Sequence, residues 1–483
     1  MTRLRNSTLL LLGLDFLAVF AVFNGVFALR ELILKNQQHA GQLFADLGRA
    51  FTDLPAIFTH PSEPLTSALF VPFALMVVSI YLIDGYRSRT DMMSLDYTSQ
   101  HILALVVAAT ATLLLIFVLL SVQFGLQYSR SAVLLSFAVL TPLTLSYRRI
   151  IYQRSHQADA ERSVVFIGDR PSAFSFRDEA RRLGLAQPVI YSSISDDSPS
   201  PFGQTGPGIQ PFSDVLAQIQ RGEVAVEAIV LRESGRELVP GVAEQLVKLY
   251  FSGVPTYTLE LFHQIYWRKI PLYRLNQIWL FQEGFPIARM PVYERLKRLS
   301  DVILASLGLI LASPVLAVTA AVVWLEDRGP VLFRQSRVGR NGTPFQIVKF
   351  RTMAVNSDQG DRYTRPGDPR ITKVGKFLRT TRIDEIPQLW NVIRGEMSMI
   401  GPRAEWDKLV TDYEREIPCY FFRHLVKPGV TGWAQVNYPY GANLEDTRRK
   451  LEYDLFYIRH YSFRLDAAIV LKTIHIMLFG KGR

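Results

Sequence analysis

Four hydrophobic runs in the first 150 residues restrict what this chain can fold into. The runs are Leu9–Leu29, Leu65–Ile83, Ile102–Val122 and Ala132–Tyr147. A helix needs about 20 apolar residues to cross a bilayer, and each run reaches or approaches that length. The first run contains Asp15 and no small-residue cleavage site follows it, so a retained helix is expected rather than a signal peptide. Residues 1–155 are therefore predicted to form a four-helix transmembrane bundle.

Basic residues beside these runs predict the orientation of the bundle. Arg3 and Arg5 precede the first run, and Arg148 and Arg149 follow the fourth. Cytoplasmic flanks carry an excess of Lys and Arg. We therefore expect a multi-pass membrane protein whose N-terminus and whole C-terminal part face the cytoplasm. The single cysteine, Cys419, is compatible with that reducing compartment.

The net charge of +11 indicates anionic partners. Lipid headgroups, phosphorylated substrates and nucleic acids all attract such a chain. Because no helix-turn-helix, zinc-finger or RNA-binding signature occurs in the sequence, nucleic acid is excluded as a predicted partner. The lipid bilayer and a phosphate-bearing substrate are the partners that we expect.

Residues 162–285 show the alternation that is typical of an α/β domain. Ser163–Ile167 and Ala228–Leu231 read as buried strands, and Val239–Tyr250 reads as a helix. We predict a Rossmann-like cytoplasmic domain. The first strand ends at Gly168, but the second and third glycines of a dinucleotide fingerprint are absent. A structural or regulatory domain is therefore favoured over a working NAD site.

A fifth hydrophobic run, Val302–Leu325, contains Ser313 and Pro314 at its centre. Proline removes a backbone hydrogen bond and kinks a helix, and the serine hydroxyl can satisfy a freed carbonyl. The residues leave two interpretations open. One is a fifth spanning helix, and the other is a re-entrant helix that enters and leaves by the same face.

Two adjacent carboxylates, Asp384 and Glu385, stand at the start of a helical pattern that should end at Gly395. A helix N-terminus favours anions. Arg379 and Arg403 flank the pair. Acids beside arginines indicate chemistry on a phosphate, with one acid holding a metal. The alternative is a helix N-cap with solvated charges.

Other basic and polar residues are candidates for the same site. Lys349 and Arg351 alternate along a predicted strand and should point to one face. A glycine-rich loop from Lys427 ends in Gln435 and Asn437. Such groups, converging on an acid pair, suit a pyrophosphate substrate with bound Mg²⁺. The alternative for each arginine is contact with lipid phosphates at the membrane surface.

These blocks together resemble the bacterial sugar transferases that act on polyisoprenyl phosphates. That family has an arginine, then Asp-Glu-Leu-Pro-Gln-Leu-Trp-Asn, then Met-Ser-x-x-Gly-Pro-Arg. Here the order is Arg379, DEIPQLWN from Asp384 and MSMIGPR from Met397. Two departures are Ala404, where the family commonly has proline, and Tyr438, where it commonly has glycine. The second resembles an exopolysaccharide-associated branch.

The resemblance implies an α+β monotopic phosphotransferase core over residues 290–483, with a re-entrant helix at 302–325 that breaks at Ser313-Pro314. It implies transfer of hexose-1-phosphate from a UDP-sugar to undecaprenyl phosphate at the bacterial inner membrane, as the start of exopolysaccharide assembly. Downstream glycosyltransferases and a second copy of the chain are further candidate partners.

The resemblance also assigns roles to residues. Asp384 is the expected nucleophile, which forms a covalent phosphosugar and releases UMP, and Glu385 is the expected Mg²⁺ ligand. Arg379 and Arg403 should hold substrate phosphates. The remaining predicted substrate-binding residues are Lys349, Arg351, Gln435, Asn437 and Asp454. For Asp454, a structural ion pair with an arginine is an equal alternative.

Two other classes of function stay open at this point. One is a nucleotide-sugar oxidoreductase or epimerase that would use the middle domain. The other is a non-enzymatic platform for polysaccharide assembly, which leaves the Asp-Glu pair unexplained. The C-terminal residues Leu451–Ile476 are expected to form amphipathic helices lying on the membrane surface.

Overall fold

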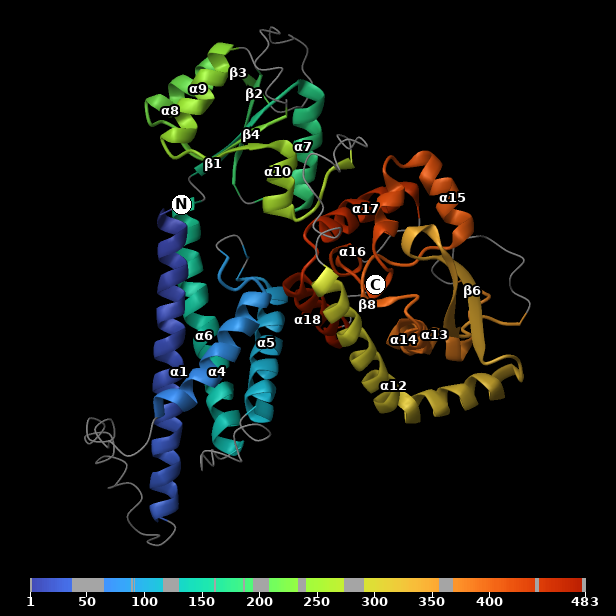
Figure 1. Ribbon diagram of the computed structural model, residues 1–483. Helices are drawn as coiled ribbons and strands as arrows, with labels where there is room; N and C mark the ends of the chain where they lie inside the picture. Colours follow the sequence, from blue (N-terminus) through green and yellow to red (C-terminus); the bar gives the residue numbers. More distant parts are fainter. Residues whose placement is uncertain are drawn as a thin grey trace. The chain divides into compact units, whose positions relative to one another are not determined.

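The computed structural model consists of two compact units, Met1–Thr258 and Leu259–Arg483. It describes residues 2–36, 65–87, 90, 92–115, 130–159, 162–185, 187–193, 208–232, 240–272, 291–355, 368–438 and 443–479. Figure 1 shows a long helical bundle and a sheet in the first unit, and a mixed helical and stranded second unit.

The first unit begins with four helices that overlap the four predicted hydrophobic runs, although the end of the third run, 116–122, lies outside the described residues. They are α1 (Thr2–Asn36), α4 (Leu65–Leu82), α5 (Leu95–Leu114) and α6 (Arg130–Asp159). Their facing side chains form one apolar core that includes Phe23, Met76, Leu105 and Phe137. By length and composition α1, α5 and α6 can cross a membrane, whereas the described apolar part of α4, Leu69–Leu82, is shorter. The predicted helices of the bundle are confirmed.

A fully buried ion pair joins two helices of this bundle. Asp15 of α1 lies 2.5 Å from Arg148 of α6, and both side chains have no exposed surface. Tyr86 and Tyr147 donate hydrogen bonds to Asp15, and Arg148 donates to the carbonyl of Gly85 at 3.0 Å. Because a charge is costly in apolar surroundings unless it is paired, this network fixes how the helices meet.

The second part of the first unit is a five-stranded parallel sheet in the order β3-β2-β1-β4-β5. Its strands are β1 (Arg162–Ile167), β2 (Val189–Ser193), β3 (Ile209–Pro211), β4 (Ala225–Leu231) and β5 (Thr256–Thr258). Its helices are α7 (Arg170–Arg182), α8 (Phe212–Gln220) and α9 (Pro240–Phe251). The predicted α/β organisation is confirmed, while a relationship to Rossmann domains stays a prediction.

Side-chain alternation along β1 explains why helices cover both faces of the sheet. Val165 and Ile167 pack into a cluster with α8 and α9. Phe166 points to the other face, where its ring stacks on Phe176 of α7 at 4.7 Å. Successive residues of a strand face opposite sides, so one hydrophobic strand supports two layers of helices.

The second unit starts earlier than the sequence indicated. We predicted a domain boundary between residues 285 and 290, but α10 (Leu259–Phe262) and the π-helix η2 (His263–Trp267) already belong to this unit. Lys269 forms a buried ion pair with Glu452 at 2.8 Å. Trp433 donates from its indole Nε1 to the carbonyl of Arg268 at 3.0 Å. These contacts attach residues 259–272 to the C-terminal helices.

The helix α12 (Pro291–Asp327) contains the fifth hydrophobic run and bends part-way along its length (Figure 1). Pro314 has no N–H to offer the carbonyl of Ile310 one turn earlier. The hydroxyl of Ser313 donates to that same carbonyl at 2.8 Å, as predicted. The predicted helix–break–helix is thus one continuous helix with a bend, and its insertion into a bilayer stays a prediction.

Large apolar side chains of α12 are exposed along most of its length. They include Ile303, Leu304, Leu307, Ile310, Leu311, Val315, Val318, Val322, Trp324 and Leu325. A contiguous apolar surface of this kind marks contact with a membrane or with another protein. The opposite side of the helix packs on α14, where Gly308 allows Leu389 to approach closely.

The rest of the second unit combines short sheets with short helices. A hairpin pairs β6 (Leu332–Val338) with β7 (Pro344–Phe350), and β8 (Ser398–Ile400) runs parallel to β9 (Gly429–Thr431). The helices and helical turns are α13 (Lys373–Thr381), η6 (Ile383–Gln388), α14 (Leu389–Arg394), α15 (Asp407–Glu416), η7 (Tyr420–Leu425), α16 (Trp433–Asn437), α17 (Leu444–Arg459) and α18 (Phe463–Phe479).

The helix α17 lies in the core, which corrects the expectation of a membrane-surface helix there. Residues Leu451 and Tyr453–Ile458 are buried, and most of them join one cluster with Trp433 and Tyr420. Aromatic side chains of α17 fill space that a membrane-surface helix would leave to lipid. The prediction treated the charged residues of this segment as a solvent-facing side. Asp454, however, is buried in an ion pair with Arg423.

Asn391 joins the helix of the acid pair to the hairpin, and its loss should destabilise the second unit. Its Nδ2 donates to the carbonyl of Gln346 and its Oδ1 accepts from the N–H of Val348, at 2.7 and 3.1 Å. Asn391→Ala leaves these two part-buried backbone groups without their partner, so we expect a loss of roughly 1–3 kcal/mol. Thermal unfolding of the detergent-solubilised protein measures this, and Asn443→Ala at a helix cap is the comparison, expected to cost about 1 kcal/mol.

Candidate active site

The acid pair lies in the first turn of a helix whose two halves differ. Residues Ile383–Gln388 form a 3-10 helix, which continues as α14 to Arg394 and ends at Gly395 with a φ of 87°. The predicted helix from Asp384 to Gly395 is therefore confirmed in extent. Arg298 of α12 caps its end by donating to the carbonyls of Val392 and Ile393 at 2.5 and 2.6 Å.

Asp384 is not the residue that caps this helix. The position before the first helical residue is occupied by Arg382, whose φ of 61° is left-handed. Asp384 follows inside the first turn, and its carboxylate accepts no hydrogen bond from any residue that the structure describes. The N-cap interpretation of the acid pair is therefore wrong.

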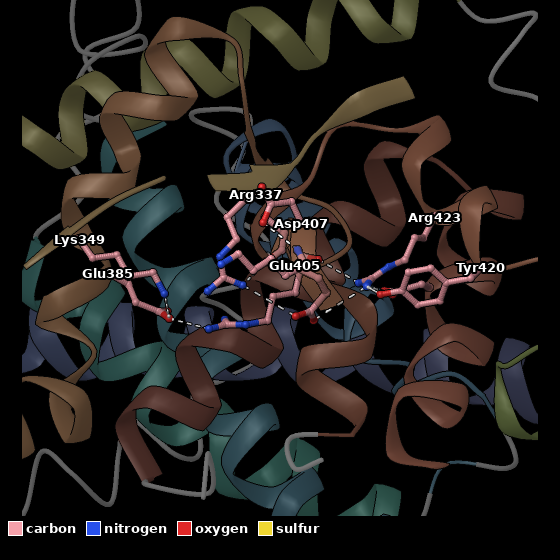
Figure 2. A network of polar contacts seen from close by, with 11 residues as sticks. Arg337, Lys349, Glu385, Glu405, Asp407, Tyr420 and Arg423 are labelled. Carbon is pink, nitrogen blue, oxygen red and sulfur yellow. Dashed lines mark hydrogen bonds and ion pairs between the residues drawn. The ribbon is translucent and has the colours of Figure 1, made fainter. Parts of the chain in front are cut away.

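Glu385 is held by three cations. Arg403 Nη2 donates to its Oε1 at 3.1 Å, Arg382 Nη1 lies 3.6 Å from its Oε2, and Lys349 Nζ lies 3.7 Å from its Oε1. Figure 2 shows Lys349 and Glu385 facing one another. Burial alone would raise the pKa of Glu385, but these cations overcome the effect and hold its pKa at about 2. Glu385 is thus a fixed negative charge.

Asp384 has the opposite environment, although it is the next residue. It is 9% exposed and makes no ion pair with the described residues. Burial, together with the negative charge of Glu385, raises the pKa of Asp384 to about 6, while Lys349, Arg379 and Arg403 act in the other direction. Its carboxylate is therefore ionised at neutral pH and more basic than an ordinary aspartate, with its lone pairs uncommitted.

Lys349 and Arg351, predicted to work together, point to different partners. Lys349 reaches Glu385, and burial lowers the pKa of Lys349 to about 8 against the opposing influence of that carboxylate. Arg351 instead forms an ion pair with Asp327 at the end of α12. Only Lys349 of the two contacts the acid pair, and phosphate binding by Arg351 stays a prediction.

Arg379 is positioned by the segment that follows β7. Its Nε donates to the hydroxyl of Thr352 at 2.8 Å. The helix α13 can approach that segment because residue 375 is glycine, where a Cβ would lie 2.1 Å from the carbonyl oxygen of Thr352. Arg379 consequently lies near Asp384, as its influence on the pKa of that carboxyl indicates.

Arg403 is brought to the site by the pairing of β8 with β9. Gly401 and Gly429 meet where the two segments touch, and a Cβ on Gly429 would lie 2.0 Å from the backbone nitrogen of Gly401. The N–H of Gly429 donates to the carbonyl of Pro402 at 2.9 Å. Two of the sequence blocks are therefore adjacent because glycine lets their backbones meet.

The other three predicted binding residues make internal contacts. Gln435 donates to the carbonyl of Val430 at 3.2 Å, and Asn437 accepts from Lys472 at 3.0 Å. Asp454 is 1% exposed and lies 2.9 Å from Arg423, which is the ion-pair alternative. Burial raises the pKa of Asp454 to about 6, with Arg423 opposing. Substrate contact by these three residues stays a prediction.

Sequence reasoning missed a polar network behind the acid pair. Figure 2 shows Arg337, Glu405, Tyr420 and Arg423 between the site and the helical core. Arg423 Nη1 donates to the hydroxyl of Tyr420 at 2.6 Å. Tyr420 and Arg423 are three residues apart on the 3-10 helix η7. This spacing is the one local signal of their contact, because side chains at i and i+3 of a 3-10 helix lie on the same side.

The acid pair fits a magnesium ion that is shared with a substrate. In the described ranges no group of three or more His, Cys, Asp or Glu side chains forms a protein-only cage. Mg²⁺ is usually bound by one or two carboxylates together with substrate phosphates and water. Glu385 supplies one such hard oxygen ligand, and the surrounding cations suit the phosphates.

Comparison with known proteins identifies the family. The bacterial sugar transferase family matches residues 292–480. A UDP-N-acetylgalactosamine-undecaprenyl-phosphate N-acetylgalactosaminephosphotransferase of Aeromonas hydrophila is 39% identical over 54% of this chain and 61% of its own length. A UDP-glucose:undecaprenyl-phosphate glucose-1-phosphate transferase of Klebsiella pneumoniae is 34% identical over 71% of this chain and 73% of its own.

The shared region can make up most of a protein. An uncharacterized sugar transferase, EpsL, of Bacillus subtilis is 41% identical over 39% of this chain, and that match covers 89% of the relative. By contrast, the match spans less than two thirds of the Aeromonas protein. The long match to the Klebsiella relative and the family match to the region of the acid pair together show that this chain is a transferase enzyme of the bacterial sugar transferase family.

Proposed function

We propose that the chain transfers a hexose-1-phosphate from a UDP-sugar to undecaprenyl phosphate through a covalent intermediate on Asp384. The observation that carries the proposal is the contrast within the acid pair. Asp384 is buried, basic and uncommitted, whereas Glu385 is fixed by Arg403, Arg382 and Lys349. A nucleophile needs free lone pairs, and a phosphate site needs cations, so both requirements are met within one turn.

The names of the relatives support the substrate class. The names of the Aeromonas and Klebsiella relatives give a UDP-sugar and undecaprenyl phosphate as substrates. One is named for N-acetylgalactosamine and the other for glucose, so the donor sugar of this chain is left to experiment. The alternative of an oxidoreductase or epimerase gains no support, since Asp169, two residues after β1, is engaged by Ser172 and Arg232.

In the first step a carboxylate oxygen of Asp384 attacks the β-phosphorus of the UDP-sugar. An oxygen–phosphorus bond forms, and the bond from that phosphorus to the bridging oxygen breaks. UMP leaves with the bridging oxygen and its electron pair, so no proton is required. Arg403, Arg379 and Lys349 would hold the phosphate oxygens and balance their charge. Mg²⁺ bound by Glu385 and the donor phosphates would neutralise the pyrophosphate.

In the second step a phosphate oxygen of the lipid attacks the phosphorus of the aspartyl intermediate. The carboxylate of Asp384 leaves, which restores the enzyme and yields a lipid diphosphate sugar. Splitting the transfer in two means that the soluble donor and the membrane-embedded acceptor need not be bound together. The product is the substrate that exopolysaccharide glycosyltransferases would extend, and a homodimer is a further expectation.

Release of UMP tests the proposed function. The full-length protein in nanodiscs is incubated with undecaprenyl phosphate, Mg²⁺ and each of a panel of UDP-sugars. We expect UMP from one or a few donors and a matching glycolipid by mass spectrometry. A panel that yields no UMP with any donor, from protein shown to be folded, would reject the proposal.

The first step should depend on pH in two directions. Asp384 must be deprotonated to attack, so the rate should rise as pH increases through about 6. Lys349 supplies charge only when protonated, so the rate should fall as pH increases through about 8. The pH dependence is measured as the rate of UMP release without lipid, because the lipid phosphate has a titration of its own that would alter the profile. Lys349→Arg should abolish the fall at high pH and keep the rise, since arginine stays protonated.

The bend of α12 predicts that both ends of this helix lie in the cytoplasm. Single cysteines at Arg295 and Arg328, which are both exposed, are introduced after Cys419→Ser removes the native cysteine. A membrane-impermeant maleimide applied to intact cells should label neither site, and both should react once the membrane is opened. Labelling of one site only in intact cells would indicate a spanning helix. Lys297 is unsuitable because it is buried against Asp466 at 2.5 Å.

A further inference from the structure

Two consecutive backbone carbonyls beside the acid pair each accept a hydrogen bond from an arginine of another element. Arg423 Nη2 donates to the carbonyl of Arg403 at 2.9 Å. Arg337 Nη1 donates to the carbonyl of Ala404 at 3.1 Å. Arg423 comes from η7 and Arg337 from β6, so the chain at residues 403–404 is held from two sides.

Arg423 is itself held by groups that fix its plane. Its side chain is 5% exposed, its Nη1 donates to the hydroxyl of Tyr420 at 2.6 Å, and Asp454 lies 2.9 Å from its Nη2. A guanidinium offers donors in a rigid fork, so fixing two of its contacts also determines where the third one points. Figure 2 shows Arg423 lying against Tyr420 and toward Glu405.

Arg403 lies just beyond β8, where its backbone forms a single β-bridge with Gly429. It follows the end of β8 by three residues, and its side chain is long and 36% exposed. From there it reaches Glu385 at 3.1 Å. A long, partly exposed side chain samples many positions unless the backbone that carries it is fixed, and a displacement of about 1 Å at a reacting centre can lower a rate 100-fold.

We propose that Arg423 and Arg337 form a backbone clamp that positions Arg403 for the donor phosphate. The proposal rests on the proposed function, in which Arg403 binds that phosphate. The two arginines are positioning residues rather than catalytic ones, because their contacts go to the backbone and to Tyr420, Asp454 and Glu405. Asp454 then acts through Arg423, from within the core.

A double-mutant cycle tests the clamp through activity. Arg423→Lys keeps the charge beside Asp454 but loses the fork, and it should lower kcat/KM for the UDP-sugar by roughly 10- to 100-fold. In an Arg403→Ala background the same substitution should change kcat/KM by less than about twofold, because the Arg403 side chain that the clamp positions is already absent. An equal loss in both backgrounds would mean a general structural role and overturn the proposal. Arg415→Lys, at an exposed arginine paired with Asp412 at 3.7 Å, is the matched control.

Amide hydrogen exchange tests the clamp without activity. Arg423→Lys should speed exchange in peptides that cover residues 401–406 and leave α14 unchanged, whereas Arg415→Lys should alter neither. Unchanged exchange at 401–406 would overturn the clamp even if the enzyme lost activity. If Arg423→Lys fails to fold, Tyr420→Phe is used in its place. It removes only one hydroxyl and should speed exchange at residues 401–406 to a smaller extent. The two proposals can fail separately. If Arg423→Lys speeds exchange at residues 401–406 but the wild-type protein releases no UMP, the proposed function is rejected and the clamp is supported.

Discussion

Asp384→Asn should abolish both half-reactions, and the wild-type enzyme should carry a hexose phosphate on the peptide that contains Asp384. The amide lacks the anionic oxygen that attacks phosphorus, so we expect a loss of at least about 1,000-fold. Wild type incubated with UDP-sugar and Mg²⁺ but no lipid should release about one UMP per enzyme and then stop. Intact-protein and peptide mass spectrometry detect the adduct.

Glu385→Gln is the matched comparison, because it changes the neighbouring acid by the same chemistry. It removes the charge that Arg403, Arg382 and Lys349 share, but it leaves Asp384 in place. Turnover should fall, the adduct should still form slowly, and added Mg²⁺ should restore part of the rate. Full turnover with lipid but no adduct at Asp384 would contradict the covalent route and favour direct attack by the lipid phosphate.

Local patterns were enough to predict much of the fold. The hydrophobic runs defined the bundle helices, and the alternation around Lys349 defined β7. The bond from Ser313 to the carbonyl that Pro314 leaves free followed from the chemistry of a single turn. Such features depend on residues that are close in the sequence, so they can be predicted from the sequence alone.

Contacts between distant segments could not be predicted in the same way. Lys349 and Arg351 share a face by alternation, yet Lys349 pairs with Glu385 and Arg351 with Asp327. The choice depends on which acid the tertiary fold brings near each cation. Likewise, the opposite environments of Asp384 and Glu385 arise from which of them faces the arginines, and adjacency in sequence says nothing of that.

The second unit begins earlier than the predicted domain boundary, and the difference has a physical reason. We predicted that residues 259–272 belong to the α/β domain, which was expected to extend to residue 285. In the structure Lys269 is buried beside Glu452, and Ile270 has no exposed surface. The region that matches the family begins only at residue 292. The attachment of these earlier residues is therefore a tertiary property of the second unit.

Where the chain is cut should consequently decide whether the second unit survives alone. A chain that begins at Leu259 keeps every described contact of this segment, and we expect it to fold and to release UMP. A chain that begins at Pro291 loses the ion pair of Lys269 with Glu452 and uncovers Trp433. Core side chains of the second unit then face water, so this shorter protein should aggregate or melt at a much lower temperature.

Point variants of the full-length chain separate this effect from truncation itself. Lys269→Ala should reproduce part of the destabilisation, because it removes the buried ammonium group that pairs with Glu452. The double variant Lys269→Met with Glu452→Met should recover most of it, since two apolar side chains of similar size replace the pair. Thermal unfolding and UMP release are measured for each protein. Equal stability and activity of the proteins that begin at Leu259 and Pro291 would show that residues 259–272 are only a linker.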